Sequence, residues 1–311
     1  MDCVDIKVGF DCNNDCLHCV TADKRRFGGL TATRIKEEIA FYKDHPEATL
    51  VITGGEPTIR QELAEVIHYA RGLGFTRIEI QTNARRLANE RLARSLAEAG
   101  LTSALVALHA PVAEVHDRIT QRAGGFAETT AGMNNLISNR VEVRTNTVIS
   151  RLNLSHLETM VPFLSGEFPE IKLAQLTFPH PNGNAYTNFD QVVPRLTEAA
   201  DAVITTLRKG LRQGIWFLVE AIPPCLLPSF EKHNMDLRHL QVAGSDFGSG
   251  VPEGRVPDYR EALQAEKRRG EQCDRCSLVT ICDGIWKEYA EKFGTEELSS
   301  VSDLDPDYLL E

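Results

Sequence analysis

The sequence predicts an α/β protein: a partial, TIM-like (βα)6 barrel followed by a small C-terminal domain. Over roughly the first 180 residues, short apolar runs alternate with amphipathic helical stretches. The alternation repeats about every thirty residues, as βαβ units do, and it is typical of a parallel sheet with right-handed crossovers. Six such units are too few for a closed eight-stranded barrel, so we expect an open or partial one.

The expected strands are short and rich in Val, Ile, Leu and Thr. They are Asp5–Gly9, Thr49–Thr53, Arg77–Thr82, Ala104–His109, Glu142–Ile149 and Lys172–Phe178. The stretches between them place apolar residues on one face, as helices that cover a sheet do. They include Thr33–Tyr42, Gln61–Arg71, Leu87–Ala99 and Glu128–Asn139.

The chain after the sixth expected strand continues this pattern once and then changes in composition. Leu196–Arg212 is an amphipathic helical stretch, and Trp216–Ala221 is an apolar strand candidate that extends the sheet or joins two regions. Residues Val242–Val256 are rich in Gly, Ser, Pro and Asp, which predicts a loop or a mobile lid.

The bulk composition is that of an ordinary globular protein. The chain has 311 residues, of which 42% are hydrophobic and 25% charged. No apolar run reaches the length of a membrane span, and the first residues, MDCVDIKVGFDC, do not resemble a signal peptide. We therefore expect a cytoplasmic protein, and a reducing compartment favours metal-binding cysteines over disulfides. The net charge of −10 argues against a nucleic-acid partner.

Three cysteines, Cys12, Cys16 and Cys19, lie in the string FDCNNDCLHC. Iron–sulfur clusters are normally held by four thiolates, so three of them on one short loop leave a metal position open. Structural zinc instead favours two separated pairs that close a tetrahedron, and His18, inside the loop, is poorly placed as a fourth ligand. The spacing favours a cluster, with zinc or plain buried thiols as the alternatives.

Polar and glycine-rich residues follow the expected strands at their carboxyl ends, where the sites of parallel α/β proteins gather. Glycine at such a turn lets the backbone approach a ligand closely, and a carboxylate can accept bonds from a ligand ammonium group. A tight turn between strand and helix is the plainer interpretation of GGEP. The residues at this rim are Gly54, Gly55, Glu56, Thr82, Asn83, His109, Asn146 and the string FPHPNGN at 178–184.

Together these motifs resemble the radical S-adenosylmethionine (SAM) superfamily. CNNDCLHC follows the first strand, GGEPT the second and TN the third, and the HDRIT…GGF segment spans residues 116–126. The resemblance implies that Cys12, Cys16 and Cys19 hold a [4Fe–4S] cluster whose open iron is chelated by SAM. One-electron reduction then cleaves SAM to methionine and a 5′-deoxyadenosyl radical, which abstracts a hydrogen atom from the substrate.

Carried over by position, the resemblance also assigns SAM-binding residues. Gly54, Gly55 and Glu56 would hold the SAM amino group. Thr82, Asn83 and Asn146 are candidates for its ribose or carboxylate. Arg118 or Arg122 would reach the carboxylate unless each is a plain surface arginine. His109 departs from the family, which commonly has Ser or Asp near that strand end, so its role stays open.

The C-terminal region carries a second set of cysteines, in which Cys273, Cys276 and Cys282 form C-x2-C-x5-C and Cys225 lies upstream in IPPCLLP. Four thiolates can close either a zinc site or a cluster. Cys3 is left over and is expected to be a small buried hydrophobe. Behind a radical SAM core, the C-x2-C-x5-C string resembles the SPASM or twitch extensions, with Gly284 and Trp286 where that pattern has them.

That second resemblance implies one auxiliary [4Fe–4S] cluster. With Cys225 as a ligand the cluster is fully ligated and passes electrons or supports the fold; without it, substrate coordinates an open iron. A rigid Pro-Pro turn favours four ligands. The implied domains are a radical SAM core at 1–185, a connecting helix and strand at 186–224, and an auxiliary-cluster domain at 225–311.

The resemblance implies a radical SAM enzyme that acts on a peptide or a small molecule and gives an oxidised, cross-linked or rearranged product. It also implies an electron donor such as flavodoxin or ferredoxin. Asn182, Asn184 and Tyr186 are candidate substrate contacts, with ordinary turn residues as the alternative. Only three residues precede Val4, so we expect no separate N-terminal peptide-recognition domain. The rival interpretation is a non-catalytic cluster- or zinc-binding sensor or scaffold.

Overall fold

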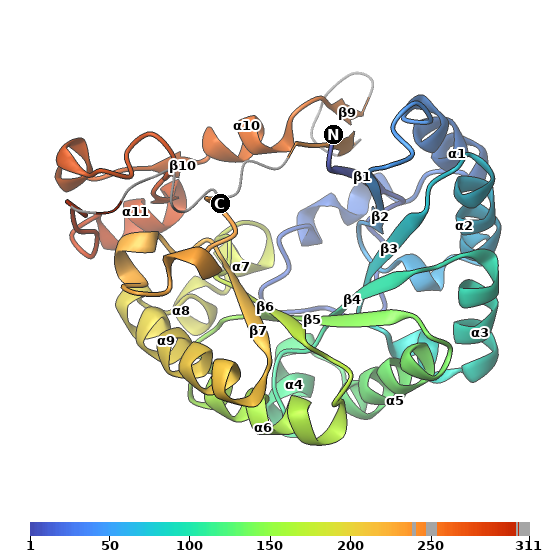
Figure 1. Cartoon of the computed structure of the whole chain (residues 1–311), viewed down its shortest axis with the longest axis horizontal. Helices are drawn as coiled ribbons and strands as arrows, with labels where there is room; N and C mark the ends of the chain where they lie inside the picture. The colour runs from blue at the N-terminus through green and yellow to red at the C-terminus, as the bar shows by residue number, and fades with distance from the viewer. Residues whose placement is uncertain (238–240, 247–253, 303, 305–311) are drawn as a thin grey trace.

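A curved nine-stranded sheet with helices along its outer side forms the body of the protein (Figure 1). The computed structural model describes residues 1–237, 241–246, 254–302 and 304. The strand order is β7-β6-β5-β4-β3-β2-β1-β8-β9, and every neighbouring pair from β7 to β8 in this order is parallel. Seven of these strands run in reverse sequence order: β1 (Cys3–Lys7), β2 (Thr49–Thr53), β3 (Arg77–Thr82), β4 (Ser103–Ala107), β5 (Glu142–Val148), β6 (Leu173–Thr177) and β7 (Trp216–Glu220).

The partial barrel expected from the sequence is confirmed. β2 and β3 have the predicted bounds, and β1, β4, β5 and β6 begin and end within two residues of their predicted bounds. Trp216–Ala221 extends the sheet, because β7 pairs with β6. The covering helices are α1 (Ala32–Phe41), α2 (Leu63–Gly72), α3 (Glu90–Ala99), α4 (Ala113–Thr120), α5 (Gly125–Ser138), α6 (Leu157–Glu167) and α9 (Leu196–Gln213).

The expectation of a loop or lid over Val242–Val256 is wrong at both of its ends. β8 (Val242–Ser245) pairs in parallel with β1, and β9 (Arg255–Val256) pairs antiparallel with β8. Residues 247–253 lie outside the described part. A side chain at Gly244 would meet the Asp5 carbonyl oxygen at 1.8 Å, so a glycine is needed where the two strands approach. Small residues that suit this approach carry little of the β-branched signal by which strands are recognised.

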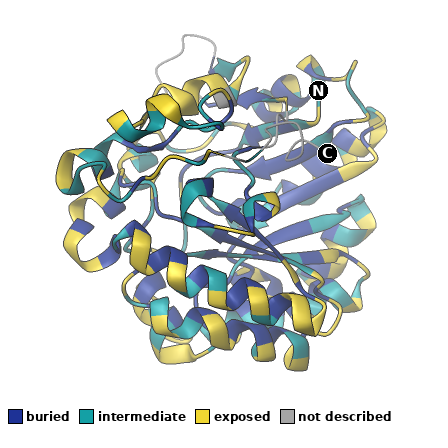
Figure 2. Ribbon diagram, turned by 60° about the vertical axis from the view of Figure 1, so that its left-hand side comes forward, coloured by how far each residue is buried: buried dark blue, intermediate teal, exposed yellow. Residues whose placement is uncertain are grey.

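The two faces of the sheet differ in polarity. Val4 and Ile6 on β1 are fully buried and pack in one apolar core with Ile35 and Ile39 of α1. Because side chains alternate along a strand, the residues between them face the concave side. This inner face carries polar and charged groups, including Asp5, Lys7, Glu79, Arg144, Asn146, Gln175 and Glu220. Figure 2 shows the buried sheet and the exposed outer sides of the helices.

The C-terminal region lies beside the β7 edge of the sheet in Figure 1. Its described elements include α10 (Tyr259–Gln264), a two-stranded pair of β10 (Lys267–Arg268) and β11 (Ile285–Trp286), and α11 (Lys287–Phe293). Tyr289 anchors it, since its hydroxyl accepts a bond from the Leu196 backbone N–H at 2.8 Å and its ring contacts Phe178. Within the described residues, every helix is too short or too polar to cross a membrane.

Candidate functional site

The cysteine loop, residues 11–20, leaves the carboxyl end of β1 and is held by side chains from distant parts of the chain. Arg85, on the 3-10 helix η3 (Arg85–Ala88), donates to the Asn13 carbonyl at 2.6 Å and to the Asn14 amide oxygen at 2.7 Å. Arg25 donates to the Asn14 carbonyl at 2.9 Å. These bonds occupy acceptors of the loop and fix its path without using its sulfur atoms.

A second clamp comes from α7 (Asn184–Thr187) and the residue after it. The side chain of Asn184 donates to the Cys16 carbonyl at 3.0 Å, and its backbone N–H donates to the Cys19 carbonyl at 2.8 Å. Asn188 donates to the Leu17 carbonyl at 3.2 Å. Asn184, which is expected to contact substrate, donates to the cysteine loop, while Tyr186 is exposed.

The GGEP turn after β2 packs directly on the start of the cysteine loop. Gly55 N–H donates to the Gly9 carbonyl at 2.7 Å and Glu56 N–H donates to the Asp11 carbonyl at 2.8 Å. A Cβ atom on Gly54 or Gly55 would lie 2.1 Å from a carbonyl oxygen of this neighbouring backbone. Both glycines are thus required by contact between two chain segments, in addition to any ligand.

Glu56 is buried, and it joins the turn to the end of β3. One carboxylate oxygen accepts bonds from the Thr58 backbone N–H and from the hydroxyls of Thr58 and Thr82. The other accepts from the Asn83 N–H at 2.6 Å. Burial raises the pKa of Glu56, while these hydrogen bonds oppose that shift. The second oxygen, with one partner, keeps acceptor capacity for a ligand.

Asn83 connects this group to the cysteines, and Asn146 belongs to a different group. The Asn83 side chain donates to Asn13 Oδ1 at 2.7 Å, and it lies 3.9 Å from Cys12 Sγ. Asn146 on β5 instead accepts from Thr177 at 2.9 Å. The structure thus brings Gly54, Gly55, Glu56, Thr82 and Asn83 together around Cys12, whereas Asn146 lies among polar groups of the inner sheet face.

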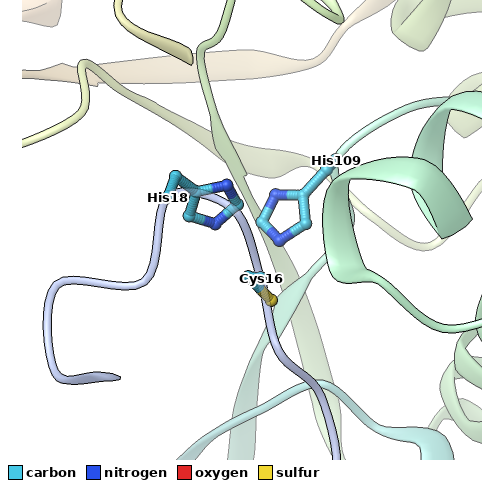
Figure 3. A group of neighbouring side chains, drawn as sticks. All are labelled: Cys16, His18 and His109. Atoms are coloured by element: carbon cyan, nitrogen blue, oxygen red, sulfur yellow. The ribbon is translucent and has the colours of Figure 1, made fainter. Parts of the chain in front are cut away.

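The rings of His18 and His109 lie beside Cys16 (Figure 3). Ligand-type atoms of Cys16, His18 and His109 lie within 4.8 Å of one another. Burial lowers the pKa of His18 to about 4 and that of His109 well below its ordinary value, with neighbouring histidines adding to both shifts. His116 lies behind His109, and burial lowers its pKa to about 4 as well. All three rings are therefore neutral at physiological pH.

Among the residues that the structure describes, this is the one group of three such atoms within 4.8 Å. The sulfurs of Cys12, Cys16 and Cys19 are therefore spread more widely than that. Thiolates on one zinc ion sit about 3.8 Å apart, as Zn–S bonds of about 2.3 Å at tetrahedral angles require. The three sulfurs are thus not drawn together as the ligands of one zinc ion are, and all three cysteines are free thiols.

Arg118 and Arg122 are both exposed. The Arg118 carbonyl accepts a bond from Gln121 at 2.6 Å, and the helix that carries Arg118 ends two residues before Arg122. Neither guanidinium joins the group around Cys12, in contrast to the buried Arg85, which no motif in the sequence marks as part of the site.

The second set of cysteines also comes together. Cys225, Cys273, Cys276 and Cys282 line one small cavity. Burial raises the pKa of Cys225, and it raises that of Cys282 to about 12. Thiols held in this way are protonated at neutral pH unless a metal binds them. Cys3 lies apart, on β1.

The inner face of the sheet ends in a polar group at the barrel mouth. Glu220 on β7 accepts a bond from Gln175 at 2.7 Å and, at 3.0 Å, shares the single hydroxyl proton of Thr177 with Asn146. Burial raises the pKa of Glu220. His180, just after β6, stacks on Trp286 with ring centroids 3.8 Å apart. The Trp286 indole N–H is buried and has no hydrogen-bond partner in the described part of the chain. An unpaired buried donor of this kind is suited to binding a ligand.

The comparisons with known proteins agree with this arrangement. The family model described as "Radical SAM superfamily" matches residues 6–164. A curated relative, the AdoMet-dependent heme synthase of Oleidesulfovibrio alaskensis, is 30% identical over 149 residues, covering 47% of this chain and 38% of the relative. The mycofactocin maturase MftC of Mycobacterium ulcerans is 24% identical over 212 residues, covering 68% and 56%. The chain thus spans less than two thirds of these relatives.

Solved structures share the fold over nearly the whole chain. Streptococcus suis SuiB bound to S-adenosylmethionine superposes with a TM-score of 0.67 at 15% identity, covering 96% of this chain and 76% of that one. Native anSMEcpe with bound AdoMet superposes with a TM-score of 0.65 at 14% identity, covering 99% and 94%.

Proposed function

Because this chain belongs to the radical SAM superfamily, we propose that it reductively cleaves S-adenosylmethionine and uses the resulting 5′-deoxyadenosyl radical to abstract a hydrogen atom from a peptide or small molecule. The observation that carries the proposal is the direct packing of the GGEP turn on the cysteine loop, through bonds of 2.7 and 2.8 Å. A cluster and the ligand of its open iron need these two segments side by side.

In this proposal the chain's own residues bind and orient the two cofactors. Cys12, Cys16 and Cys19 hold a [4Fe–4S] cluster with one open iron, which supplies the electron for SAM cleavage. Gly54, Gly55 and Glu56 receive the SAM amino group. The role of Glu56 is supported by its second carboxylate oxygen, which has one hydrogen-bond partner and can accept another bond. Thr82, Asn83 and Asn146 are assigned to the rest of SAM; the hydrogen bonds support Thr82 and Asn83 more directly than Asn146.

The second cysteine cavity is assigned to one auxiliary [4Fe–4S] cluster with four protein ligands, Cys225 included. The four side chains line one cavity, and no three of these sulfurs, all of them in the described residues, lie within 4.8 Å of one another as zinc ligands would. A fully ligated cluster passes electrons and stabilises the region. The domain division that we propose keeps a core at 1–185, a connecting part at 186–224 and an auxiliary-cluster domain at 225–311, although β8 and β9 of the last range pair with the core sheet.

The substrate is proposed to enter at the barrel mouth, beside His180, Trp286 and Glu220. We favour a peptide, because similar folds include SuiB bound to its precursor peptide SuiA and anSMEcpe bound to a Kp18Cys peptide. A small molecule is the second candidate, since one relative is a probable GTP 3′,8-cyclase. The electron donor is assigned to a small redox protein such as flavodoxin or ferredoxin.

The test is anaerobic reconstitution with iron and sulfide, followed by SAM and dithionite. We expect 5′-deoxyadenosine from the wild type and none from the variant in which Cys12, Cys16 and Cys19 are replaced by alanine, while iron at the tail cysteines remains. Deuterium transfer from labelled candidate peptides into 5′-deoxyadenosine would identify the substrate. Zinc in place of iron, or intact clusters without deoxyadenosine, would support the non-catalytic sensor or scaffold instead.

A further inference from the structure

His109 is held in one orientation at the carboxyl end of β4. It is 2% exposed. Its backbone carbonyl accepts from Asn153 at 2.8 Å, and its backbone N–H donates to His116 Nδ1 at 3.3 Å. Its ring meets the His18 ring edge to face at 4.5 Å. A buried ring fixed on several sides keeps its orientation whether or not a ligand is bound.

A further contact, from Val148, decides which ring nitrogen of His109 carries the proton. The backbone N–H of Val148 donates to His109 Nδ1 at 3.4 Å, so Nδ1 is the acceptor. A neutral imidazole has one acceptor and one donor nitrogen, so the proton is on Nε2. In Figure 3 one ring nitrogen of His109 points toward the Cys16 sulfur, and Val148 occupies the other.

This tautomer argues against a mononuclear metal site at Cys16, His18 and His109, although their ligand-type atoms lie within 4.8 Å of one another. A nitrogen that binds metal must be deprotonated. Moving the proton to Nδ1 would set its N–H against the Val148 N–H, two donors facing each other in a buried place, which is costly. The group is therefore arranged as a donor facing sulfur, not as a metal ligand.

We infer that His109 is a positioning residue whose Nε2–H donates a hydrogen bond to the Cys16 thiolate when that thiolate holds the cluster. The inference rests on the proposed function. Hydrogen bonds to the sulfurs of iron–sulfur clusters set their reduction potential. A hydrogen-bond donor stabilises the reduced cluster, which is the more negative state. His109 therefore raises the reduction potential of the cluster, so that the cluster is more easily reduced by the electron that then cleaves SAM.

The first test needs no cluster. In the cluster-free protein labelled with nitrogen-15, NMR of the His109 ring is expected to show protonated Nε2 and unprotonated Nδ1. A protonated Nδ1 would overturn the inference. Tight binding of Co²⁺ to the cluster-free protein would also overturn it, if the thiolate charge-transfer bands disappear in both His18→Leu and His109→Leu. That result would show that the group is a metal site.

The second test compares reduction potentials by EPR-monitored titration of the reconstituted protein. The variant His109→Leu removes the donor, and His109→Gln keeps an N–H donor of similar reach. At a fixed solution potential we expect roughly a tenfold lower ratio of reduced to oxidised cluster in His109→Leu, equivalent to about 59 mV for one electron, and partial recovery in His109→Gln.

The matched control is His116→Leu, which removes a neighbouring buried histidine whose ring lies 5.7 Å from that of His109 without removing the group that faces Cys16. Because His116 Nδ1 also accepts the His109 backbone N–H at 3.3 Å, the potential of this variant is expected to shift by less than that of His109→Leu. An equal shift in both leucine variants would show an effect of polarity or packing and overturn the inference, as would an unchanged potential in His109→Leu with iron content intact. A wild type that holds no reducible cluster would instead overturn the proposed function.

Discussion

Arg85 brings a buried positive charge to the cysteine loop. Its guanidinium donates to two acceptors of the loop and pairs with Glu128 at 2.6 Å, so the charge is balanced and hydrogen-bonded. Its contact with Asn14 joins positions 71 residues apart. A residue of this kind orders a metal-binding loop before the metal arrives, which lowers the entropy cost of binding.

Replacing Arg85 by methionine is expected to lower the stability of the ordered cysteine loop by about 1.5–3 kcal/mol, which is the usual contribution of hydrogen bonds to a charged group. Iron would be lost faster to a chelator, and this rate is the measurement. The control is Arg86→Met, since Arg86 is the exposed neighbour on the same 3-10 helix. Equal iron loss in both variants would contradict the role given to Arg85.

Gly55 is the second single residue on which the position of the cysteine loop depends. In Gly55→Ala, the new methyl group would lie 2.1 Å from the Asp11 carbonyl oxygen, so the turn and the cysteine loop must move apart. We expect low iron content after reconstitution in an otherwise folded protein, measured by iron analysis and circular dichroism. Gly166→Ala is the control, because a Cβ there meets nothing within 4 Å; iron content equal to the wild type in Gly55→Ala would refute the argument.

Among the elements, the short helix α7 holds the cysteine loop in place. Its four residues present Asn184 to the cysteine loop, and Asn188 follows directly. Gly183 precedes the helix with a φ of 54°, and a Cβ there would lie 2.6 Å from the Cys19 carbonyl oxygen. The loop after β6 is thus shaped to contact the loop after β1.

Asn184→Leu is expected to remove the bonds that the Asn184 side chain donates to the Cys16 carbonyl at 3.0 Å and to Asp15 Oδ1 at 3.2 Å. The reconstituted cluster is then expected to bleach faster in the presence of a chelator. The physical reason is that the Cys16 carbonyl loses its side-chain donor, worth about 1 kcal/mol. Thr187→Ala, an exposed change on the same short helix, is the control. Bleaching as slow as in the wild type would show that α7 does not hold the loop.

The strands and loops differ in how well the sequence predicts them. β2 and β3 were predicted to the residue, because buried parallel strands are continuous β-branched runs bounded by turns. β8 was missed, because VAGS has small residues suited to a close approach to β1. The cysteines and GGEP could be read as motifs, but the Asn184 contact joins positions 168 residues apart. Nothing local in the chain encodes such a pairing.

For the molecule as a whole, the four cysteines that line one cavity come from two segments: Cys225 lies just after β7, and the other three lie in the C-terminal region. Cys225→Ser is expected to lower total iron while iron bound at the N-terminal cysteines and deoxyadenosine formation persist, measured by iron analysis and product assay. Cys3→Ser is the matched control, since Cys3 lies on β1 apart from both sites. Full iron content in Cys225→Ser would mean that three tail cysteines suffice.

Docking of the C-terminal region is also expected to depend on pH through Glu297. Burial alone would raise its pKa, but hydrogen bonds from Tyr289 and Thr197 lower it below the ordinary value. A lowered folded-state pKa contributes stability that is complete above the pKa of the unfolded chain, about 4.3, and is lost as the pH falls through the folded-state value.

Glu297→Gln should therefore unfold more easily than the wild type near neutral pH and equally easily in strong acid. Urea denaturation followed at a series of pH values is the measurement. Glu296→Gln is the control, because Glu296 is exposed. A difference between Glu297→Gln and the wild type that does not shrink with acid would contradict this assignment.

The position of β1 in the sheet has a consequence for how the protein is made. β1 lies between β2 and β8, and β8 contributes contacts across 238 residues of chain, as between Lys7 and Ser245. During synthesis β1 has an unpaired edge until β8 has left the ribosome, and such edges invite aggregation. Cluster insertion at the cysteines that follow β1 is thus expected to be a late event, after translation has brought β8 into place.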